Sequence, residues 1–208
     1  TDRDIIIPCS SGGAFTTAMQ CFLNKQGQTI ISNKALASMG YGLSGAIGAS
    51  IAHPQKRTIL MEGDGGFSQN LQELATAHRN NLNIKMFIFE NSGYASIRMT
   101  QKSYFNGKYV GCDTNTGLGF PQWGKLFDAY SIPSIEISRT DFPNDAKFQE
   151  LFNSNTPAAF IIHLDPEQTY FPKISSKMTE IGSMESNPLH LMTPDLPPEI
   201  QSQVIKFI

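Results

Sequence analysis

The sequence has few cysteines, little net charge and no long apolar run, and each absence excludes a class of protein. Its 208 residues carry 16 basic and 18 acidic side chains, and the formal charge of −2 gives no electrostatic reason to expect nucleic acid as a partner. No apolar run approaches the roughly 20 residues that a membrane helix needs, and the N-terminus lacks the layout of a signal peptide. We therefore expect a partner that is a small molecule or another protein, and no membrane contact.

The three cysteines, Cys9, Cys21 and Cys112, are widely spaced and form no C-x-x-C pair. An odd number without such a pair predicts neither a disulfide framework nor a zinc site. A reducing, cytoplasmic location is expected. The chain also begins without a methionine and enters a strand-like run almost at once. This start favours an excised domain of a longer protein, with a natural small subunit as the alternative.

What the sequence does contain is an alternation of short apolar runs and longer segments with helical spacing, in a composition that suits one globular domain. Six runs predict strands: Asp4–Pro8, Thr29–Ser32, Thr58–Glu62, Lys85–Phe89, Ser134–Ile137 and Ala158–Leu164. Five segments predict helices: Gly13–Asn24, Gly42–Ala52, Asn70–Asn80, Gln122–Tyr130 and Lys147–Asn153. Because several strands are apolar at consecutive positions, helices should cover both faces of the sheet. The expected fold class is α/β, doubly wound, with a mainly parallel sheet.

Two regions break this alternation. Residues 100–121 are rich in Gly, Asn, Thr and Tyr and are too long for an ordinary connection. They predict a functional loop or lid, with a surface insertion as the alternative. Six prolines follow residue 165, which predicts a domain over residues 1–165 and an irregular tail over 166–208. The tail should pack on the domain or on a partner.

One candidate motif is a G-x-G-x-x-G formed by Gly40, Gly42 and Gly45, followed by a helical stretch and then by Glu62. This pattern is typical of a nicotinamide dinucleotide-binding oxidoreductase domain. The fingerprint needs a buried strand before its first glycine, and residues 34–39 are a weak strand. The alternative is that the small residues of this segment let a helix pack closely on the sheet.

A second candidate site combines the ends of two expected strands. Thr58–Glu62 runs into Gly63-Asp64-Gly65-Gly66, and Lys85–Phe89 runs into Glu90-Asn91. At one sheet edge, the Asp64 carboxylate, the Asn91 amide oxygen and a carbonyl near Gly93 would leave about three octahedral positions for phosphate oxygens and water, as Mg²⁺ prefers. Backbone N–H groups there favour anions. We interpret this edge as a metal-bridged diphosphate site; a turn or cap role is the alternative for Asp64.

The Gly63-Asp64-Gly65 motif followed by Glu90-Asn91 resembles the thiamine diphosphate (ThDP) signature, which is GDG with a later closing NN. Further blocks occur in the same order: Ser38–Leu43, Gly45–Ala49, Gln72–Thr76 and Asn91–Arg98. Together they are similar to the C-terminal, diphosphate-binding domain of the acetolactate synthase branch, which includes pyruvate oxidase and benzoylformate decarboxylase. The resemblance extends from about Asp4 to about His163.

The resemblance also implies roles for particular residues. Asp64, Asn91 and the carbonyl of Gly93 would bind Mg²⁺, and Met39 would hold the cofactor bent, with a core methionine as the alternative. The implied cofactor-binding set is Ser11, Gly12, Ala37, Met39, Gly63, Asp64, Gly65, Gly66, Asn91, Gly93 and Tyr94. Within it, Gly65 and Gly66 would offer N–H groups to the diphosphate, the Ala37 carbonyl would accept from the aminopyrimidine, and Ser11 and Gly12 would form a phosphate turn that lacks the family's histidine. Glu90 replaces the first Asn of the closing pair, and none of the four histidines matches a motif.

The implied activity is that of a ThDP- and Mg²⁺-dependent, acetolactate synthase-like transferase that decarboxylates a 2-keto acid and passes on its acyl unit (carboligation). No catalytic residue is expected in this chain, because the family's glutamate belongs to a pyrimidine-binding domain of the same or a partner chain. The isolated chain should therefore be inactive, and the full-length enzyme a homodimer or homotetramer, with FAD binding left open. The alternatives are a ThDP-dependent decarboxylase or oxidase, and the nicotinamide-binding domain.

Overall fold

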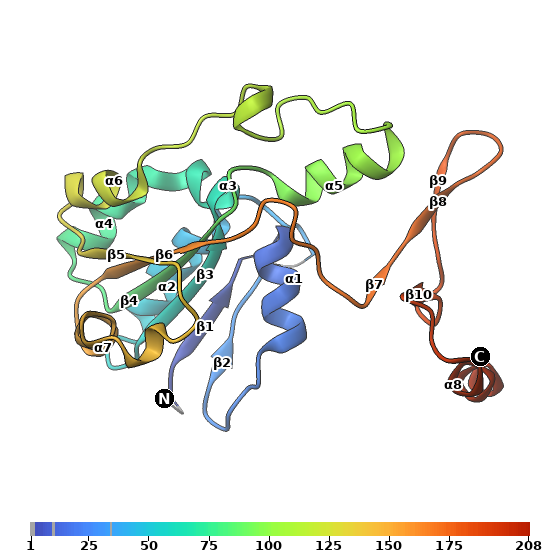
Figure 1. The fold of residues 1–208 in the computed structure, drawn as a ribbon. Helices are drawn as coiled ribbons and strands as arrows, with labels where there is room; N and C mark the ends of the chain where they lie inside the picture. Colours follow the sequence, from blue (N-terminus) through green and yellow to red (C-terminus); the bar gives the residue numbers. More distant parts are fainter. Residues whose placement is uncertain (1–2, 10, 34) are drawn as a thin grey trace. The chain divides into compact units, whose positions relative to one another are not determined.

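A six-stranded parallel sheet forms the core of the first compact unit, which ends at Glu167 (Figure 1). The structure is a computed structural model that describes residues 3–9, 11–33 and 35–208. The strand order is β2-β1-β3-β4-β6-β5, and every pairing in this sheet is parallel. The strands are β1 (Ile5–Pro8), β2 (Thr29–Ile30), β3 (Thr58–Gly63), β4 (Ile84–Glu90), β5 (Ser134–Ile137) and β6 (Ala158–His163). All six expected strands are present, and the predicted fold class is confirmed.

Helices cover both faces of the sheet. They are α1 (Gly12–Cys21), α2 (Tyr41–Ala52), α3 (Asp64–Phe67), α4 (Leu74–Arg79), α5 (Ala95–Tyr104), α6 (Trp123–Ala129) and α7 (Ala146–Asn153), with 3₁₀ turns at Ser68–Glu73, Thr114–Thr116 and Phe142–Asn144. Side chains of α2, α3, α4 and α6 pack with one face of the sheet in the larger apolar cluster. The α7 helix packs with the other face in a second cluster, which contains stacked phenylalanine rings.

The structure differs from the expectation in the segment 100–121 and at the start of the helix expected from Asn70. The α5 helix extends to Tyr104, so the first part of the segment 100–121 is helical and not a loop. The helix expected from Asn70 begins at Leu74, because Asn70 has non-helical dihedral angles. The Asn70 amide instead donates to the Gly40 carbonyl at 3.3 Å and to Ser44 Oγ. This bond ties the turn after α3 to the start of α2.

The strand order places a topological switch point between β1 and β3. The chain leaves β1 towards β2 on one side and leaves β3 towards β4 on the other. In open parallel sheets, ligands bind in the crevice outside the carboxyl ends of the strands at such a point. The segments that follow β1 and β3 are those that contain Ser11, Gly12 and Asp64.

A buried ion pair lies at the opposite, amino end of the sheet. The Asp4 carboxylate accepts hydrogen bonds from Arg57 Nη2 at 2.9 Å and from Arg57 Nε at 3.3 Å, and the two side chains are 3% and 10% exposed. Arg57 also donates to the Phe152 carbonyl at 3.0 Å, and its guanidinium lies 3.9 Å from the centre of the Phe152 ring. These contacts join β1, the start of β3 and the end of α7.

The Asp4→Asn substitution is expected to lower the free energy of unfolding by about 3–5 kcal/mol, because it leaves a buried guanidinium without its counter-charge. Urea denaturation measures the change. Asp141→Asn is the control, since it breaks an exposed pair with Arg139, and it should cost less than about 1 kcal/mol. Equal losses in the two variants would contradict a special role for the buried pair.

Residues 168–208 form a second compact unit. Strand β7 (Lys173–Ile174) pairs with β10 (Met192–Thr193), and β8 (Ser176–Met178) pairs with β9 (Met184–Ser186), both antiparallel. The α8 helix (Pro198–Val204) and a 3₁₀ turn (Ile205–Phe207) follow. Whether this tail packs on the domain or on a partner stays a prediction. None of the helices in the described part of the chain has the length and hydropathy of a membrane span.

Candidate functional site

Asp64 begins α3 directly after β3, and its carboxylate joins the ends of two strands. Asp64 is only 1% exposed. Oδ1 accepts a hydrogen bond from the Gly65 N–H at 2.7 Å. Oδ2 accepts from the N–H groups of Asn91 at 3.0 Å and Gly93 at 3.3 Å, both beyond the end of β4. The expected convergence of these residues is therefore present in the structure.

The Asn91 side chain supplies a buried oxygen with no donor. Its Oδ1 atom is buried and has no hydrogen-bond partner. Burying an amide oxygen without a partner costs about 1–3 kcal/mol, and native proteins rarely leave such groups unsatisfied. A divalent cation held between Asn91 and Asp64 would give this oxygen a partner. An amide oxygen is a ligand type that Mg²⁺ accepts. The residues present fit the metal that the sequence predicts.

The turn between Asn91 and Tyr94 is held from both sides. Gly93 forms a bridge with Asp113, and the Tyr94 N–H donates to the Cys112 carbonyl at 2.8 Å. On the other side, the Tyr94 ring lies against Gly65, where an added Cβ would stand 2.3 Å from a ring carbon. Because Gly65 donates its N–H to Asp64, a diphosphate contact at Gly65 would require that bond to open.

Burial also sets the electrostatics of this edge. It raises the pKa of Asp64 to about 6, against the opposing effect of the N–H groups of Asn91 and Gly65. Burial likewise raises the pKa of Glu62 to about 7, and Glu62 contacts Cys9, whose thiol pKa burial also raises. A bound cation would favour the deprotonated form of Asp64, because opposite charges at close range stabilise each other.

The G-x-G-x-x-G segment lacks the context of a dinucleotide site. Of the expected weak strand, residues 35–39 are described, and none of them belongs to a strand. Gly42 packs so closely on β3 that an added Cβ would lie 2.0 Å from Glu62 Oε2 and 3.0 Å from Leu60 Cδ1. Glu62 therefore points into the domain beneath α2. The glycine at this position serves helix packing on the sheet, as the alternative interpretation predicted.

The remaining predicted residues lie on connections near the same edge. Ser11 is the N-cap of α1, and Gly12 has a φ of 75°. Ala37 has a φ of 50°, and Met39 is 40% exposed, both on the connection before α2. The exposure of Met39 does not favour the alternative of a core methionine. Cofactor contacts of these four residues stay predictions.

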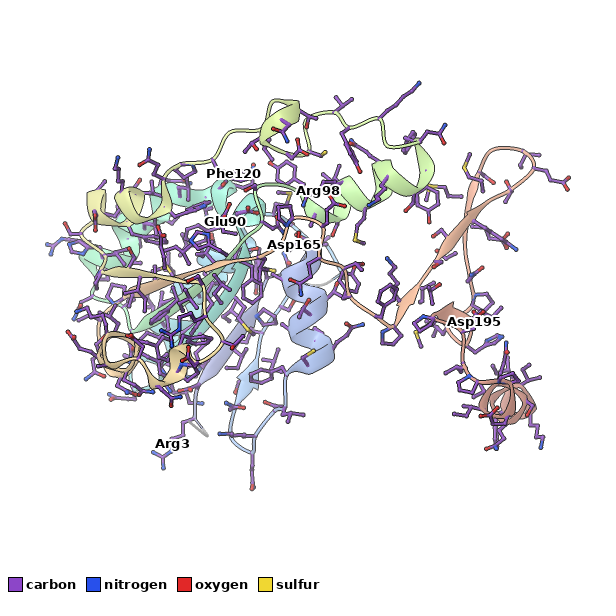
Figure 2. The ribbon with its side chains drawn as sticks, in the orientation of Figure 1. Arg3, Glu90, Arg98, Phe120, Asp165 and Asp195 are labelled. Atoms are coloured by element: carbon purple, nitrogen blue, oxygen red, sulfur yellow. The ribbon has the colours of Figure 1, made fainter. Side chains whose placement is uncertain are left out.

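Sequence reasoning missed a row of three side chains that crosses the carboxyl ends of β5, β6 and β4. His163 Nδ1 lies 2.9 Å from Glu90 Oε2, and His163 Nε2 lies 3.3 Å from Glu136 Oε2. Hydrogen bonds to Glu90 and, more weakly, Glu136 raise the pKa of His163. Figure 2 labels Glu90 at this edge. The only sequence signal was that Glu90 and His163 each end an apolar run.

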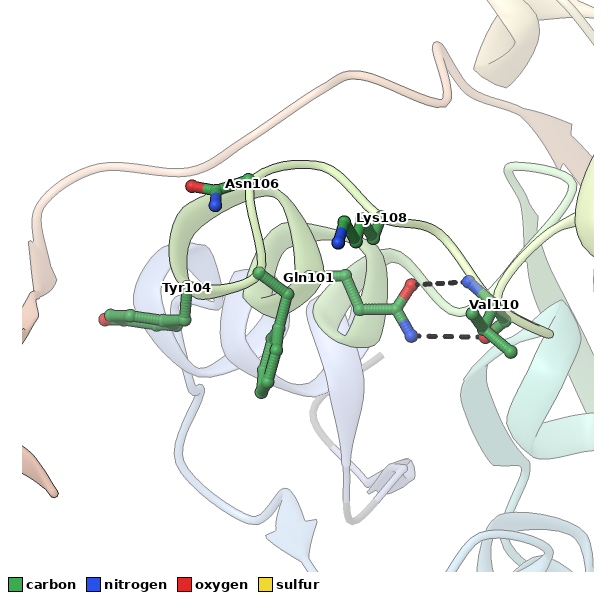
Figure 3. Close-up of a pocket in the computed structure, with 6 residues that line it drawn as sticks. Gln101, Tyr104, Asn106, Lys108 and Val110 are labelled. Carbon is green, nitrogen blue, oxygen red and sulfur yellow. Dashed lines mark hydrogen bonds between the residues drawn. The ribbon is translucent and has the colours of Figure 1, made fainter. Parts of the chain in front are cut away.

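A separate pocket of about 480 Å³ lies at the end of α5 (Figure 3). It is lined by Gln101, Tyr104, Phe105, Asn106, Lys108 and Val110. The Gln101 side chain makes two hydrogen bonds to the backbone of Val110, at 3.0 and 3.1 Å. None of the predicted site residues lines this pocket, so it is distinct from the edge that contains Asp64.

Comparison with known proteins gives a match to one family over most of the domain. The model of the thiamine pyrophosphate enzyme, C-terminal TPP binding domain, matches residues 11–162. The acetolactate synthase large subunit of Cyanidium caldarium is 30% identical over 74% of this chain and 26% of its own length. In Escherichia coli (strain K12), the large subunits of acetolactate synthase isozymes 2 and 1 are each 27% identical, over 82% and 76% of this chain and 30% and 27% of their own lengths. The chain thus spans less than a third of these relatives.

Proposed function

Because the chain belongs to the thiamine pyrophosphate enzymes, as a C-terminal TPP-binding domain, we propose that the carboxyl edge of its sheet binds the diphosphate of ThDP through Mg²⁺. Asp64 and Asn91 would hold the metal through side-chain oxygens, and Gly93 through its carbonyl. The observation that carries this proposal is the buried, unpartnered Oδ1 of Asn91, a residue whose backbone N–H bonds to the Asp64 carboxylate. The other residues expected to contact the cofactor lie at the same strand ends or just beyond them: Ser11 and Gly12 after β1, Gly63, Gly65 and Gly66 at the end of β3, and Tyr94 after β4. Ala37 and Met39 lie on the connection to α2.

The reaction that we propose for the full-length enzyme is decarboxylation of a 2-keto acid followed by carboligation, as in the acetolactate synthases that it resembles. ThDP, when bound, supplies the carbanion chemistry of the decarboxylation. The residues of this chain bind and orient the cofactor. The glutamate that activates it is expected on a pyrimidine-binding domain of the same or a partner chain, within a homodimer or homotetramer. A decarboxylase or oxidase with the same cofactor is the runner-up, and product analysis of the full-length enzyme separates them.

Calorimetry with ThDP and Mg²⁺, compared with NAD, tests the cofactor assignment. We expect Mg²⁺-dependent ThDP binding to the wild-type chain, no such binding to the Asp64→Ala variant, and no binding of NAD to either. NAD binding that is unaffected by Asp64→Ala would instead support the dinucleotide alternative and refute the proposal.

The isolated chain, supplied with ThDP, Mg²⁺ and pyruvate, is expected to form neither acetolactate nor acetaldehyde. The physical reason is that the domain provides cofactor anchoring without the group that activates the thiazolium ring. Product assays after long incubation measure this. Robust turnover by the isolated polypeptide would contradict the assignment of the missing half of the site to another domain.

A further inference from the structure

The turn that contains Asn91 is fixed by the side chain of the residue before it. Glu90 ends β4, and its Oε1 accepts hydrogen bonds from the Ser92 N–H at 3.2 Å and from Ser92 Oγ at 3.0 Å. Ser92 has a φ of 60°, a left-handed conformation that is uncommon for residues other than glycine. Such a conformation persists where surrounding contacts enforce it, and it is a feature of ligand-binding sites. The two hydrogen bonds that Ser92 donates to Glu90 are contacts of this kind.

Glu90 is itself held by the neighbouring strand. His163 stands opposite Glu90 in the register of β6 and β4, and their side chains meet at 2.9 Å. The Glu90 side chain is 19% exposed, whereas that of Glu136, on the far side of His163, is 64% exposed. Glu90 therefore uses one carboxylate oxygen for the turn and the other for His163.

The conformation of Ser92 decides where its two neighbours point. The N–H groups of Asn91 and Gly93 both reach Asp64 Oδ2, although Ser92 lies between them. A change of φ at Ser92 would turn one of these N–H groups away and would move the Asn91 side chain from its buried position. Because the Glu90 carboxylate holds Ser92 in this conformation, it also fixes the relative positions of Asn91 and Asp64.

We propose that Glu90 is a positioning residue for the cation-binding turn and that His163 holds Glu90 in the orientation that this requires. The expected consequence is tighter binding of Mg²⁺ with ThDP, and this consequence rests on the proposed function. It concerns a position at which this chain departs from the closing NN of the ThDP signature. Groups one layer outside a metal site typically change metal affinity by about 10–100-fold.

The test compares Glu90→Ala, Glu90→Gln and the matched control Glu136→Ala in the full chain. Mg²⁺–ThDP affinity is measured by calorimetry, and amide hydrogen exchange of Asn91 and Gly93 is measured by NMR without ligand. Glu90→Ala is expected to weaken binding about tenfold and to accelerate exchange at both amides, which bond to Asp64 and not to Glu90. Glu90→Gln keeps an acceptor for Ser92 and should restore both values to within about threefold of wild type.

The same measurements on His163→Ala and His163→Gln test the second contact. His163→Ala should accelerate exchange at Asn91 and Gly93, and His163→Gln, which can still donate to Glu90, should not. Unchanged exchange in Glu90→Ala would overturn the proposal, as would equal effects of Glu90→Ala and Glu136→Ala or a Glu90→Gln variant as weak as Glu90→Ala. Failure of the wild type to bind Mg²⁺–ThDP would refute the proposed function, while the exchange measurement would still decide the positioning role.

Discussion

The Asn91→Leu substitution is expected to weaken Mg²⁺–ThDP binding by at least about 100-fold while leaving the ligand-free domain as stable as before, or more stable. A direct metal ligand should matter at least as much as the outer groups, whose loss costs about 10–100-fold. Leucine has nearly the shape of asparagine and removes a buried oxygen that has no donor in the structure. Removing such an atom relieves a cost of about 1–3 kcal/mol. Calorimetry and urea denaturation measure the two effects separately.

The chain offers a matched control in Asn83, at the other end of β4. Its Oδ1 is also buried without a partner, next to the first residue of the strand. Asn83→Leu should therefore also preserve or raise the free energy of unfolding, but it should leave Mg²⁺–ThDP affinity unchanged. If Asn91→Leu bound the cofactor as tightly as Asn83→Leu, Asn91 would not be a metal ligand.

In Asn91→Leu, cofactor binding should weaken while the free energy of unfolding is kept or raised. These opposite effects distinguish a polar residue that serves binding from one that serves stability. Truncation of Asp64 cannot make this distinction, because its carboxylate accepts three backbone N–H groups and its loss would also disturb the turn. The Asn91→Leu change, by contrast, removes no backbone N–H, so the bond from residue 91 to Asp64 is expected to remain. Asn91 is therefore the more informative position for testing the site.

The fold was predictable because the strands have strong local signals. Ile5–Pro8 and Ile84–Glu90 are nearly continuous apolar runs, as buried parallel strands require. The convergence of Asp64 and Asn91 followed from the geometry of a parallel sheet, in which neighbouring strands end at one edge. Element boundaries were less accurate. The helix was expected to start at Asn70, but the side-chain amide of Asn70 bonds to the carbonyl of Gly40, which is distant in the chain.

The contacts that sequence reasoning missed depend on pairing between distant segments. Glu90 and His163 meet only because β4 and β6 are adjacent in a register that places them opposite each other. The left-handed conformation of Ser92 could not be predicted from the sequence, because serine favours ordinary turns. Burial of the Glu62 carboxylate likewise depends on how closely α2 approaches β3. Such features are decided by tertiary packing and not by local pattern.

The Gly93→Ala substitution is expected to lower the free energy of unfolding by about 2–3 kcal/mol and to weaken Mg²⁺–ThDP binding at least about tenfold. An added Cβ would lie 2.4 Å from the Cys112 carbonyl oxygen and 3.1 Å from Asp113 Cα. Both are backbone atoms, so no side chain can rotate to make room. The turn must separate from residues 112 and 113, and the bond from Tyr94 N–H to the Cys112 carbonyl must lengthen or break.

Urea denaturation and calorimetry measure the two effects. The control is Gly119→Ala, on the connection between α5 and α6 that also contains Cys112 and Asp113. An added Cβ at Gly119 would meet no atom within 4 Å, so this variant should keep wild-type affinity and a free energy of unfolding within about 0.5 kcal/mol of wild type. If Gly93→Ala matched Gly119→Ala in both measurements, the bridge to Asp113 would not be what holds the turn. If Gly93→Ala lost stability but kept affinity, the position of the Gly93 carbonyl would not matter for the cation.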